Sequence, residues 1–309
     1  MPGLTFLASS PRVAPGQLTW PAWEALRSAD RVLTGTAEHP QLPYVRQAGV
    51  AVEVTEPDAA ALVREASSGT VVWLAGPEGD ETLMRSVGSI LVGLDEPPQV
   101  EVVQGAYDLP GARFLDLVAV METLRRECPW DRKQTHASLA PYLLEEAYEV
   151  VDTIEGGDLE ALREELGDVL MQVAFHAEVS PDFTVDDVAE GIVEKLVRRH
   201  PHVFGDVTVA DADEVNANWD KIKSAERGED ASIFQGVPMA QPALSLAAQL
   251  QRRAAKAGMP EELFTDDEAG ADLFALVRRL REEGRDPEAE LRAAARRFHD
   301  RVQRREDAE

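Results

Sequence analysis

The chain has 309 residues, 44% of them hydrophobic, and a formal net charge of −26. This length suffices for two or three domains with a substantial core. A chain this acidic repels nucleic acid and anionic membrane surfaces at long range, so we expect no direct nucleic-acid binding. It has no apolar run of about 18 residues, and Cys128 is its single cysteine. These features exclude a membrane span, an intrachain disulfide and a four-cysteine zinc site, and the expected location is cytoplasmic.

The first third of the chain has the pattern of a mixed α/β domain. Patterns typical of helices occur at Trp20–Ser28 and Ala59–Ser67. They alternate with short apolar runs typical of strands, at Leu4–Ala8, Arg31–Leu33, Val50–Val54 and Thr70–Ala75. We therefore predict a small α/β domain over residues 1–108.

After Leu109-Pro110-Gly111 the strand signals stop and the pattern becomes helical. Capping residues, glycines and prolines divide this part into segments. The predicted helices are Arg113–Glu127, Pro141 to Gly156, Asp158 to Glu178, Thr184 to Arg199, Asp211 to Glu226 with a stop at Gly228, 242–257, and 266–305 with a break near Gly284. On the third of these helices the expected core stripe is Leu162, Leu166, Val169, Leu170 and Val173.

Ten carboxylates and a single base, Arg163, lie between Pro141 and Leu170. Helical spacing places Glu145, Glu146 and Glu149 close together on one helix and makes Glu165 and Asp168 neighbours on the next. The two glycines between these helices allow a tight antiparallel pairing, so the two clusters could face each other. Crowded carboxylates repel one another unless a cation lies between them, and a hard divalent ion prefers oxygen ligands. The alternative is a solvated acidic face, but such a face normally mixes signs of charge.

A cluster of cations follows in Lys195, Arg198 and Arg199, just before His200-Pro201-His202. Cations near the end of a helix are stabilised by its dipole, and arginine also binds phosphate with two hydrogen bonds. Both explanations stay open on the residues alone. The indole rings of Trp130 and Trp219 could stack on a base or pack in the core, and Lys223 could meet a phosphate or solvent. His176 is expected to be a core residue, and His136 gives no signal.

Together these segments resemble the MazG family of nucleoside triphosphate pyrophosphohydrolases. The likeness extends over about 111–257, and its most specific part is an EExxE motif followed by an ExxD motif. The matching segments are Cys128-Pro129-Trp130-Asp131, Gln134-Thr135, Pro141 to Glu149, Glu164 to Asp168, Lys195 to Phe204, and Trp219 to Glu226.

The resemblance implies an all-α helical bundle, a homodimer, and Mg²⁺-dependent hydrolysis of NTPs or dNTPs to monophosphate and diphosphate, with Mn²⁺ as a substitute. Catalysis would fall to Glu145, Glu146, Glu149, Glu165 and Asp168. The last four would bind the metal, and Glu145 would be a ligand, a partner of a ligand or a water-activating base. Nucleotide contacts would come from Trp130, Lys195, Arg198, Arg199, Trp219 and Lys223. The expected role is housekeeping of the nucleotide pool.

The flanking regions carry weaker resemblances. Residues 1–108 resemble a truncated tetrapyrrole methylase domain, through Ala29-Asp30-Arg31-Val32 and Thr36 to Pro40. Ser9-Ser10-Pro11-Arg12 stands where a glycine-rich loop is expected, so we predict a vestigial, inactive α/β domain. The catalytic domain is predicted at 111–232. Residues 236–309 form a predicted helical tail that resembles part of a second MazG repeat.

Three other functions compete with this one. A di-iron carboxylate bundle needs Glu-x-x-His pairs, which the carboxylate clusters lack. A methyltransferase that uses residues 1–108 is disfavoured by the short length and the absent glycine loop. A regulatory protein that binds nucleotides without turnover would have the same sequence pattern. A turnover assay distinguishes it from the enzyme.

Overall fold

The computed structural model describes residues 2–77, 79–226, 232–265 and 268–307. The chain divides into two compact units, Met1–Glu190 and Gly191–Glu309. The ends predicted at Met1, Gly228, Asp266 and Glu309 lie outside the described residues. No helix of the described part is long and apolar enough to cross a membrane.

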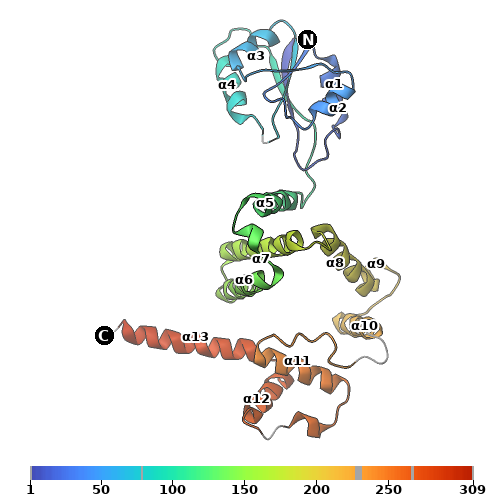
Figure 1. The fold of residues 1–309 in the computed structure, drawn as a ribbon, viewed down its shortest axis with the longest axis vertical. Helices are drawn as coiled ribbons and strands as arrows, with labels where there is room; N and C mark the ends of the chain where they lie inside the picture. Colours follow the sequence, from blue (N-terminus) through green and yellow to red (C-terminus); the bar gives the residue numbers. More distant parts are fainter. Residues whose placement is uncertain (1, 78, 227–231, 266–267, 308–309) are drawn as a thin grey trace. The chain divides into compact units, whose positions relative to one another are not determined.

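The first unit opens with a five-stranded sheet in the order β3-β2-β4-β1-β5, in which all pairs are parallel. Parallel neighbours need crossover connections, and helices supply them here (Figure 1). The strands are β1 (Gly3–Ala8), β2 (Arg31–Thr34), β3 (Val52–Val54), β4 (Thr70–Leu74) and β5 (Gln99–Gln104). The helices are α1 (Trp20–Ser28), α2 (Leu42–Gln47), α3 (Ala59–Ala66) and α4 (Glu81–Leu91).

Helices cover both faces of this sheet, and its central strands are accordingly rich in apolar residues. On one face Trp73 is fully buried among side chains of α3 and α4, and on the other Leu74 packs with Leu26 and Leu42 of α1 and α2. The predicted α/β domain is therefore present, and β4 buries four of its five residues.

The sequence pattern missed β5. This strand lies at the edge of the sheet, beside β1, and its Val100 and Val103 are partly buried while Gln99 and Glu101 are exposed. An edge strand with one solvated face has too few apolar residues to stand out. The strand predicted from Val50 begins at Val52.

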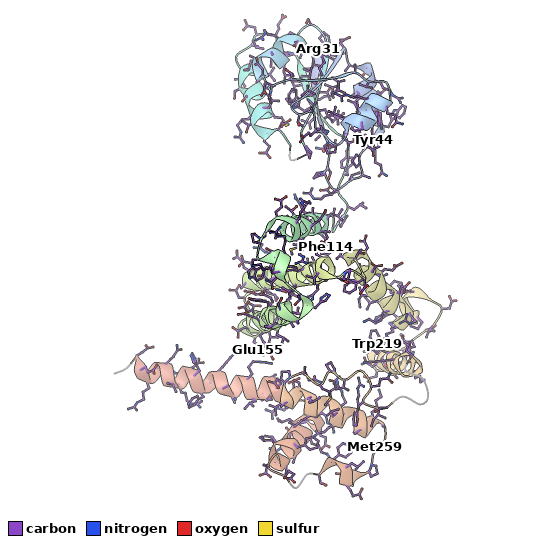
Figure 2. The ribbon with its side chains drawn as sticks, viewed as in Figure 1. Arg31, Tyr44, Phe114, Glu155, Trp219 and Met259 are labelled. Carbon is purple, nitrogen blue, oxygen red and sulfur yellow. The ribbon has the colours of Figure 1, made fainter. Side chains whose placement is uncertain are left out.

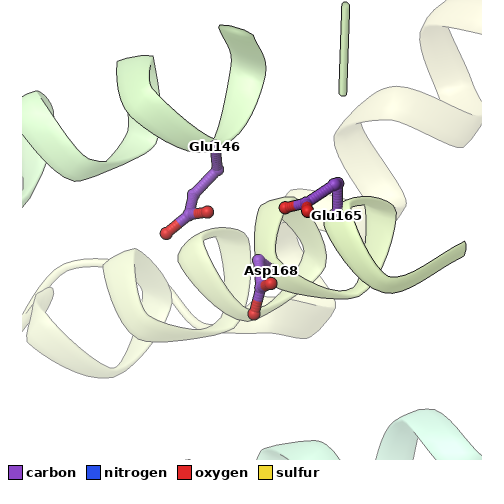
Figure 3. Close-up of side chains that lie close together, drawn as sticks. All are labelled: Glu146, Glu165 and Asp168. Atoms are coloured by element: carbon purple, nitrogen blue, oxygen red, sulfur yellow. The ribbon is translucent and has the colours of Figure 1, made fainter. Parts of the chain in front are cut away.

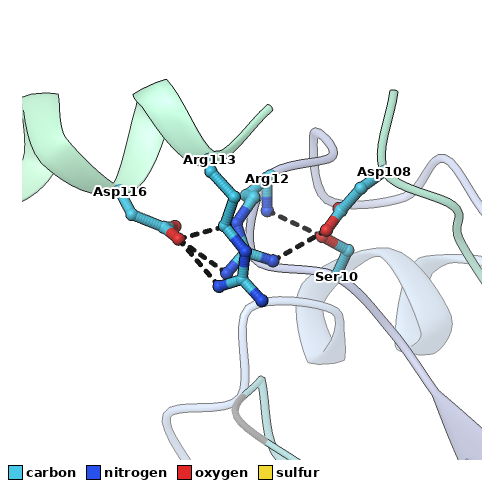
Figure 4. A network of polar contacts seen from close by, with 5 residues as sticks. All are labelled: Ser10, Arg12, Asp108, Arg113 and Asp116. Carbon is cyan, nitrogen blue, oxygen red and sulfur yellow. Dashed lines mark hydrogen bonds and ion pairs between the residues drawn. The ribbon is translucent and has the colours of Figure 1, made fainter. Parts of the chain in front are cut away.

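A charged network joins the loop after β1 to the start of α5 (Arg113–Glu127). Arg12 donates to Asp108 at 2.8 Å and to Asp116 at 2.7 Å, while Arg113 reaches Asp116 at 3.1 Å and Ser10 hydrogen bonds to Asp108 (Figure 4). These contacts lower the pKa values of Asp108 and Asp116. The network connects the sheet to the helical part of the unit.

Helices α6 (His136–Gly156) and α7 (Leu159–Val179) follow α5 and a short turn, η1 (Asp131–Lys133). The second helix was predicted to begin at Pro141, which is wrong. It begins at His136, because Thr135 and Ser138 form a capping box that satisfies the free backbone N–H groups of the first turn. Pro141 lies inside the helix, near its start, where its ring costs one backbone hydrogen bond.

The buried core of this helical part is small. Met121, Leu139, Ala174 and Phe175 form it, with few other side chains packed against them. The core stripe predicted on α7 is partly wrong, because Leu166 is 50% exposed and Leu170 is 44% exposed. A single chain therefore leaves a substantial apolar surface on these helices.

Helix α8 (Val185–Arg199) begins as predicted, with Thr184 and Asp187 exchanging capping hydrogen bonds. The break predicted near Gly284 separates the last two helices, and Gly284 has a positive φ of 74°. The remaining elements are α9 (Pro201–Phe204), α10 (Ala212–Ala225), α11 (Ala243–Lys256), η2 (Glu261–Phe264), α12 (Ala271–Glu282) and α13 (Pro287–Glu306). From Arg113 onward, the described residues form helices and no strand, so the all-α prediction for this part is confirmed.

Candidate metal site and candidate phosphate site

The turn between α6 and α7 brings the two carboxylate clusters onto adjacent helices. Gly157 has a φ of 75°, the left-handed conformation that ends a helix, and Asp158 caps α7 by accepting from the amides of Glu160 and Ala161. The chain reverses within this short turn, and α6 and α7 pack together extensively. Residues from the two halves of the acidic stretch are thus side by side.

Three carboxylates converge across this helix pair. Glu146 comes from α6, and Glu165 and Asp168 come from α7; one oxygen of each lies within 4.8 Å of the others (Figure 3). All three side chains are half-buried. The structure therefore brings together the ExxD pair and the second glutamate of the EExxE motif, as the spacing indicated.

The carboxylates of this group repel one another because they carry like charges. Burial raises the pKa of Glu146, and the charges of Asp168 and Glu149 raise it further. Burial and the neighbouring Glu149 likewise raise the pKa of Glu165. Among the described residues, no lysine or arginine forms an ion pair with any of the three converging carboxylates. Arg163, the one base of the stretch, lies 4.0 Å from Glu160 instead.

Glu149 and Glu145 differ in their relation to the cluster. Glu149 is exposed, yet it is close enough to raise the pKa values of both Glu146 and Glu165, so it lies at the edge of the group. Glu145 is exposed and is the weakest of the charges that act on Glu146. The structure thus separates a converging set from Glu145, although both clusters are acidic.

This donor set fits a hard divalent cation. The group offers oxygen ligands from separate carboxylates, which is what Mg²⁺ binds, and a cation between them would remove the repulsion that raises two of their pKa values. Because the ligands come from two helices fixed by one tight turn, the site is formed without rearrangement of a loop.

The predicted phosphate ligands lie in the second unit. Arg198 and Arg199, at the end of α8, both bind the carboxylate of Glu226, which follows α10. The guanidinium of Arg199 also lies over the ring of Trp219, 5.3 Å from its centroid, and the rings of His200 and Trp219 pack edge to face. Figure 2 labels Trp219. Lys195 is exposed, and Lys223 is half-buried. The spacing of Arg198, Arg199 and Trp219 gave no hint that Glu226 joins them.

Trp130 has a packing role in the first unit. Its ring meets Tyr142 edge-on at 6.0 Å and Phe175 of the core at 6.3 Å, and half of the side chain stays exposed. Arg125 donates to the backbone carbonyl of Asp131 and so holds the adjacent turn. The exposed half leaves a surface on which a nucleotide base could stack.

His136 and His176 form a pair that the sequence did not reveal. Their Nδ1 atoms are 2.9 Å apart and their rings are stacked, with Phe183 against His136. Burial lowers the pKa of His176. The pair links the first turn of α6 to the end of α7, so it supports the helix pair that carries the carboxylates.

Comparison with known proteins adds the family context. Residues 134–204 match the model of the MazG nucleotide pyrophosphohydrolase domain. An uncharacterized 26.1 kDa protein of Streptomyces cacaoi is 47% identical over 72% of this chain and 93% of its own length. The nucleoside triphosphate pyrophosphohydrolase/pyrophosphatase MazG of Thermotoga maritima is 39% identical over 64% of this chain and 87% of its own length. The nucleoside triphosphate pyrophosphohydrolase of Escherichia coli K12 is 44% identical over 46% of this chain and 57% of its own length.

Proposed function

Because the chain belongs to the MazG family, we propose that it is a Mg²⁺-dependent nucleoside triphosphate pyrophosphohydrolase. It converts an NTP or dNTP and water to the monophosphate and diphosphate. The observation that carries this proposal is the convergence of Glu146, Glu165 and Asp168 without a cationic partner among the described residues. We assign hydrolysis to residues 111–232 and no catalytic role to residues 1–108.

Glu146, Glu165 and Asp168 would hold the Mg²⁺ ion, with Glu149 as the fourth carboxylate at the edge of the group. When bound by these residues, the ion would supply neutralisation of the triphosphate charge and polarisation of the phosphoryl oxygens. Mn²⁺ prefers the same oxygen ligands and would substitute. The two helices fix these carboxylates before substrate arrives, so little reorganisation is needed.

Glu145 is the proposed acceptor of the proton of the attacking water. It lies next to Glu146 in the chain, is exposed, and stands outside the converging set, so its carboxylate is available for a hydrogen bond. Phosphoryl transfer needs an oriented nucleophile and compensated charge more than a covalent intermediate. A carboxylate beside the metal ligands meets the first need.

The basic group would bind the substrate itself. Arg198 and Arg199 present guanidinium forks that suit phosphate oxygens, and Lys195 and Lys223 add further positive charge. Trp219, and Trp130 through its exposed face, would stack on the base. Stacking tolerates any base, so we propose that several NTPs and dNTPs are substrates and that the enzyme maintains the nucleotide pool.

We further propose that the chain acts as a homodimer. The α5–α7 part buries only a small core, while apolar side chains of α6 and α7 stay exposed. These are Leu144, Tyr148, Ile154, Leu159, Leu166 and Leu170. Monomeric proteins rarely leave such a surface open to water, and a second copy with the same surface would cover it.

A panel of NTPs and dNTPs with Mg²⁺ or Mn²⁺ tests the function. The assay should resolve nucleoside monophosphate, nucleoside diphosphate, pyrophosphate and orthophosphate. We expect equal amounts of monophosphate and pyrophosphate and no turnover with EDTA. Release of orthophosphate would contradict the cleavage position, and binding without turnover would favour the regulatory alternative.

A further inference from the structure

The carboxylate of Glu226 occupies both arginines that we assign to phosphate binding. The Nε atom of Arg198 donates to its Oε1 atom at 2.8 Å. Arg199 binds it side-on, through Nη2 at 2.5 Å and Nε at 3.2 Å to Oε2. One carboxylate therefore satisfies two guanidinium groups at once.

The same arginine is held from its other side by an aromatic ring. Arg199 lies over Trp219 and is only 15% exposed, and the rings of His200 and Trp219 pack edge to face with their centroids 4.8 Å apart. The fork of Arg199 is thus fixed in orientation, and its hydrogen-bonding edge points at Glu226. Residues assigned to phosphate and to base are here assembled around a carboxylate that belongs to the chain.

We propose that Glu226 is an internal competitor of the substrate. Its carboxylate occupies Arg198 and Arg199 until the polyphosphate of the substrate displaces it. This inference rests on the proposed function, because that function assigns the two arginines to phosphate. Carboxylate and phosphate present oxygen pairs that arginine binds in the same two-pronged way. Displacement exchanges one negative charge for the several charges of a triphosphate.

The surroundings of Glu226 make the contact exchangeable. Its side chain is 25% exposed, and Arg198 is 54% exposed, so water can replace both partners. An ion pair with an arginine as exposed as Arg198 is weak. A carboxylate at the end of a helix also gains nothing from the helix dipole, because cations are favoured there. Among the described residues, Arg198 and Arg199 are the side chains that bind the Glu226 carboxylate, and a more highly charged anion outcompetes it.

The competitor stays charged at all physiological pH values. Hydrogen bonds from Arg199 and Arg198 lower the pKa of Glu226 to about 2. Only the concentration and charge of an anion, rather than pH, can therefore release the arginines. A monophosphate product, with fewer charges than the substrate, displaces Glu226 less effectively, which favours product release.

The substitution Glu226→Gln keeps the shape of the side chain and removes its charge. With ATP as substrate at saturating Mg²⁺, we expect KM to fall by about two- to fivefold, the range expected when an exposed ion pair no longer competes. Calorimetric titration of the chain with inorganic pyrophosphate and Mg²⁺ should show the same decrease in Kd.

A matched control is Glu261→Gln. Glu261 accepts from Arg278 at 3.0 Å in the same unit, and Arg278 lies over the ring of Phe264 much as Arg199 lies over Trp219. This variant removes a carboxylate from a similar pair that we assign no role in substrate binding. Its KM and its Kd for pyrophosphate should equal those of the wild-type chain.

An unchanged or higher KM in Glu226→Gln would overturn the inference, because Glu226 would then be neutral or would hold the arginines ready for substrate. Thermal unfolding should accompany both variants. If Glu226→Gln does not fold, Glu226→Asp carries the test, since its shorter reach should also lower KM, and a KM at or above that of the wild type overturns the proposal. Failure of the proposed function is distinct, because the wild-type chain would then release no pyrophosphate from ATP.

Discussion

Asp168 on α7 lies beside Glu146 on α6, close enough for its charge to raise the pKa of the Glu146 carboxyl. Two negative charges held together by a tight helix pair repel each other. Binding of a cation between them removes this repulsion and is therefore favourable. This relationship is the basis of the account of the site.

Removing one of these charges should weaken metal binding. In Glu146→Gln the amide keeps the size of the side chain but binds a hard cation less strongly, so we expect affinity for Mg²⁺ to fall about tenfold or more. Isothermal titration, or electron paramagnetic resonance with Mn²⁺, measures this. Glu160→Gln is the control, because Glu160 lies on α7 at 83% exposure and away from the converging set. Equal affinity in Glu146→Gln and the wild type would rule out the ligand role.

The stability of the protein should depend on pH and Mg²⁺ together. The pKa values of Glu146 and Glu165 are above their usual value of 4.5 in the folded state. The folded state therefore binds protons more tightly than the unfolded state, and the free energy of unfolding decreases as pH rises from about 4.5 through the raised pKa values. Mg²⁺ stabilises the ionised form, so its effect on the melting temperature should be larger at pH about 7.5 than at pH about 5.

Thermal unfolding with and without MgCl₂ at both pH values measures this difference. In the double variant of Glu146→Gln and Glu165→Gln, both this part of the pH dependence and the shift by Mg²⁺ should disappear. A shift by Mg²⁺ that is the same at the two pH values would show that the ion binds elsewhere.

A charge on the exposed apolar face should dissociate the dimer. Ile154 on α6 is 58% exposed in the single chain. If a second copy covers it, Ile154→Glu loses burial of about 2 kcal/mol or more and places a charge in the interface, so the dimer dissociation constant should rise more than about thirtyfold. Analytical ultracentrifugation gives the constant. Val92→Glu, at an 89% exposed position after α4, is the matched control and should leave the dimer intact.

Loss of Arg12 should loosen the connection between the sheet and α5. Arg12→Ala leaves Asp108 and Asp116 facing each other without the cation between them, so residues 105–112 should become more sensitive to limited proteolysis and the melting temperature should fall. Arg113→Ala should have a small effect, because Arg113 is 81% exposed and contacts only Asp116 among the residues of this network. Similar cleavage rates in the two variants would contradict this role of Arg12.

The local features of the site could be predicted from the sequence because they depend on short spacing. Glu165 and Asp168 are one turn apart, and Gly157 and Asp158 fix the reversal that brings Glu146 to them. Contacts between distant positions could not be predicted in this way. Glu226 meets Arg198 from 28 residues away, and His136 meets His176 from 40, with no periodic pattern to connect them.

The burial of apolar residues was harder to predict. The stripe that includes Leu166 and Leu170 has the period of a buried helix face, but that period is the same whether the chain itself or a second copy covers it. The start of α6 was predicted wrongly for another reason. Pro141 favours the first turn of a helix, but the capping box of Thr135 and Ser138 is the stronger local signal.

The most direct test of the account is a measurement of the products formed from ATP by the wild-type chain and by Glu165→Gln as the Mg²⁺ concentration is raised. The account predicts AMP and pyrophosphate in equal amounts from the wild type, at a rate that saturates with Mg²⁺, and a rate at least about a hundredfold lower from the variant. ADP and orthophosphate as products, or a variant as active as the wild type, would contradict it.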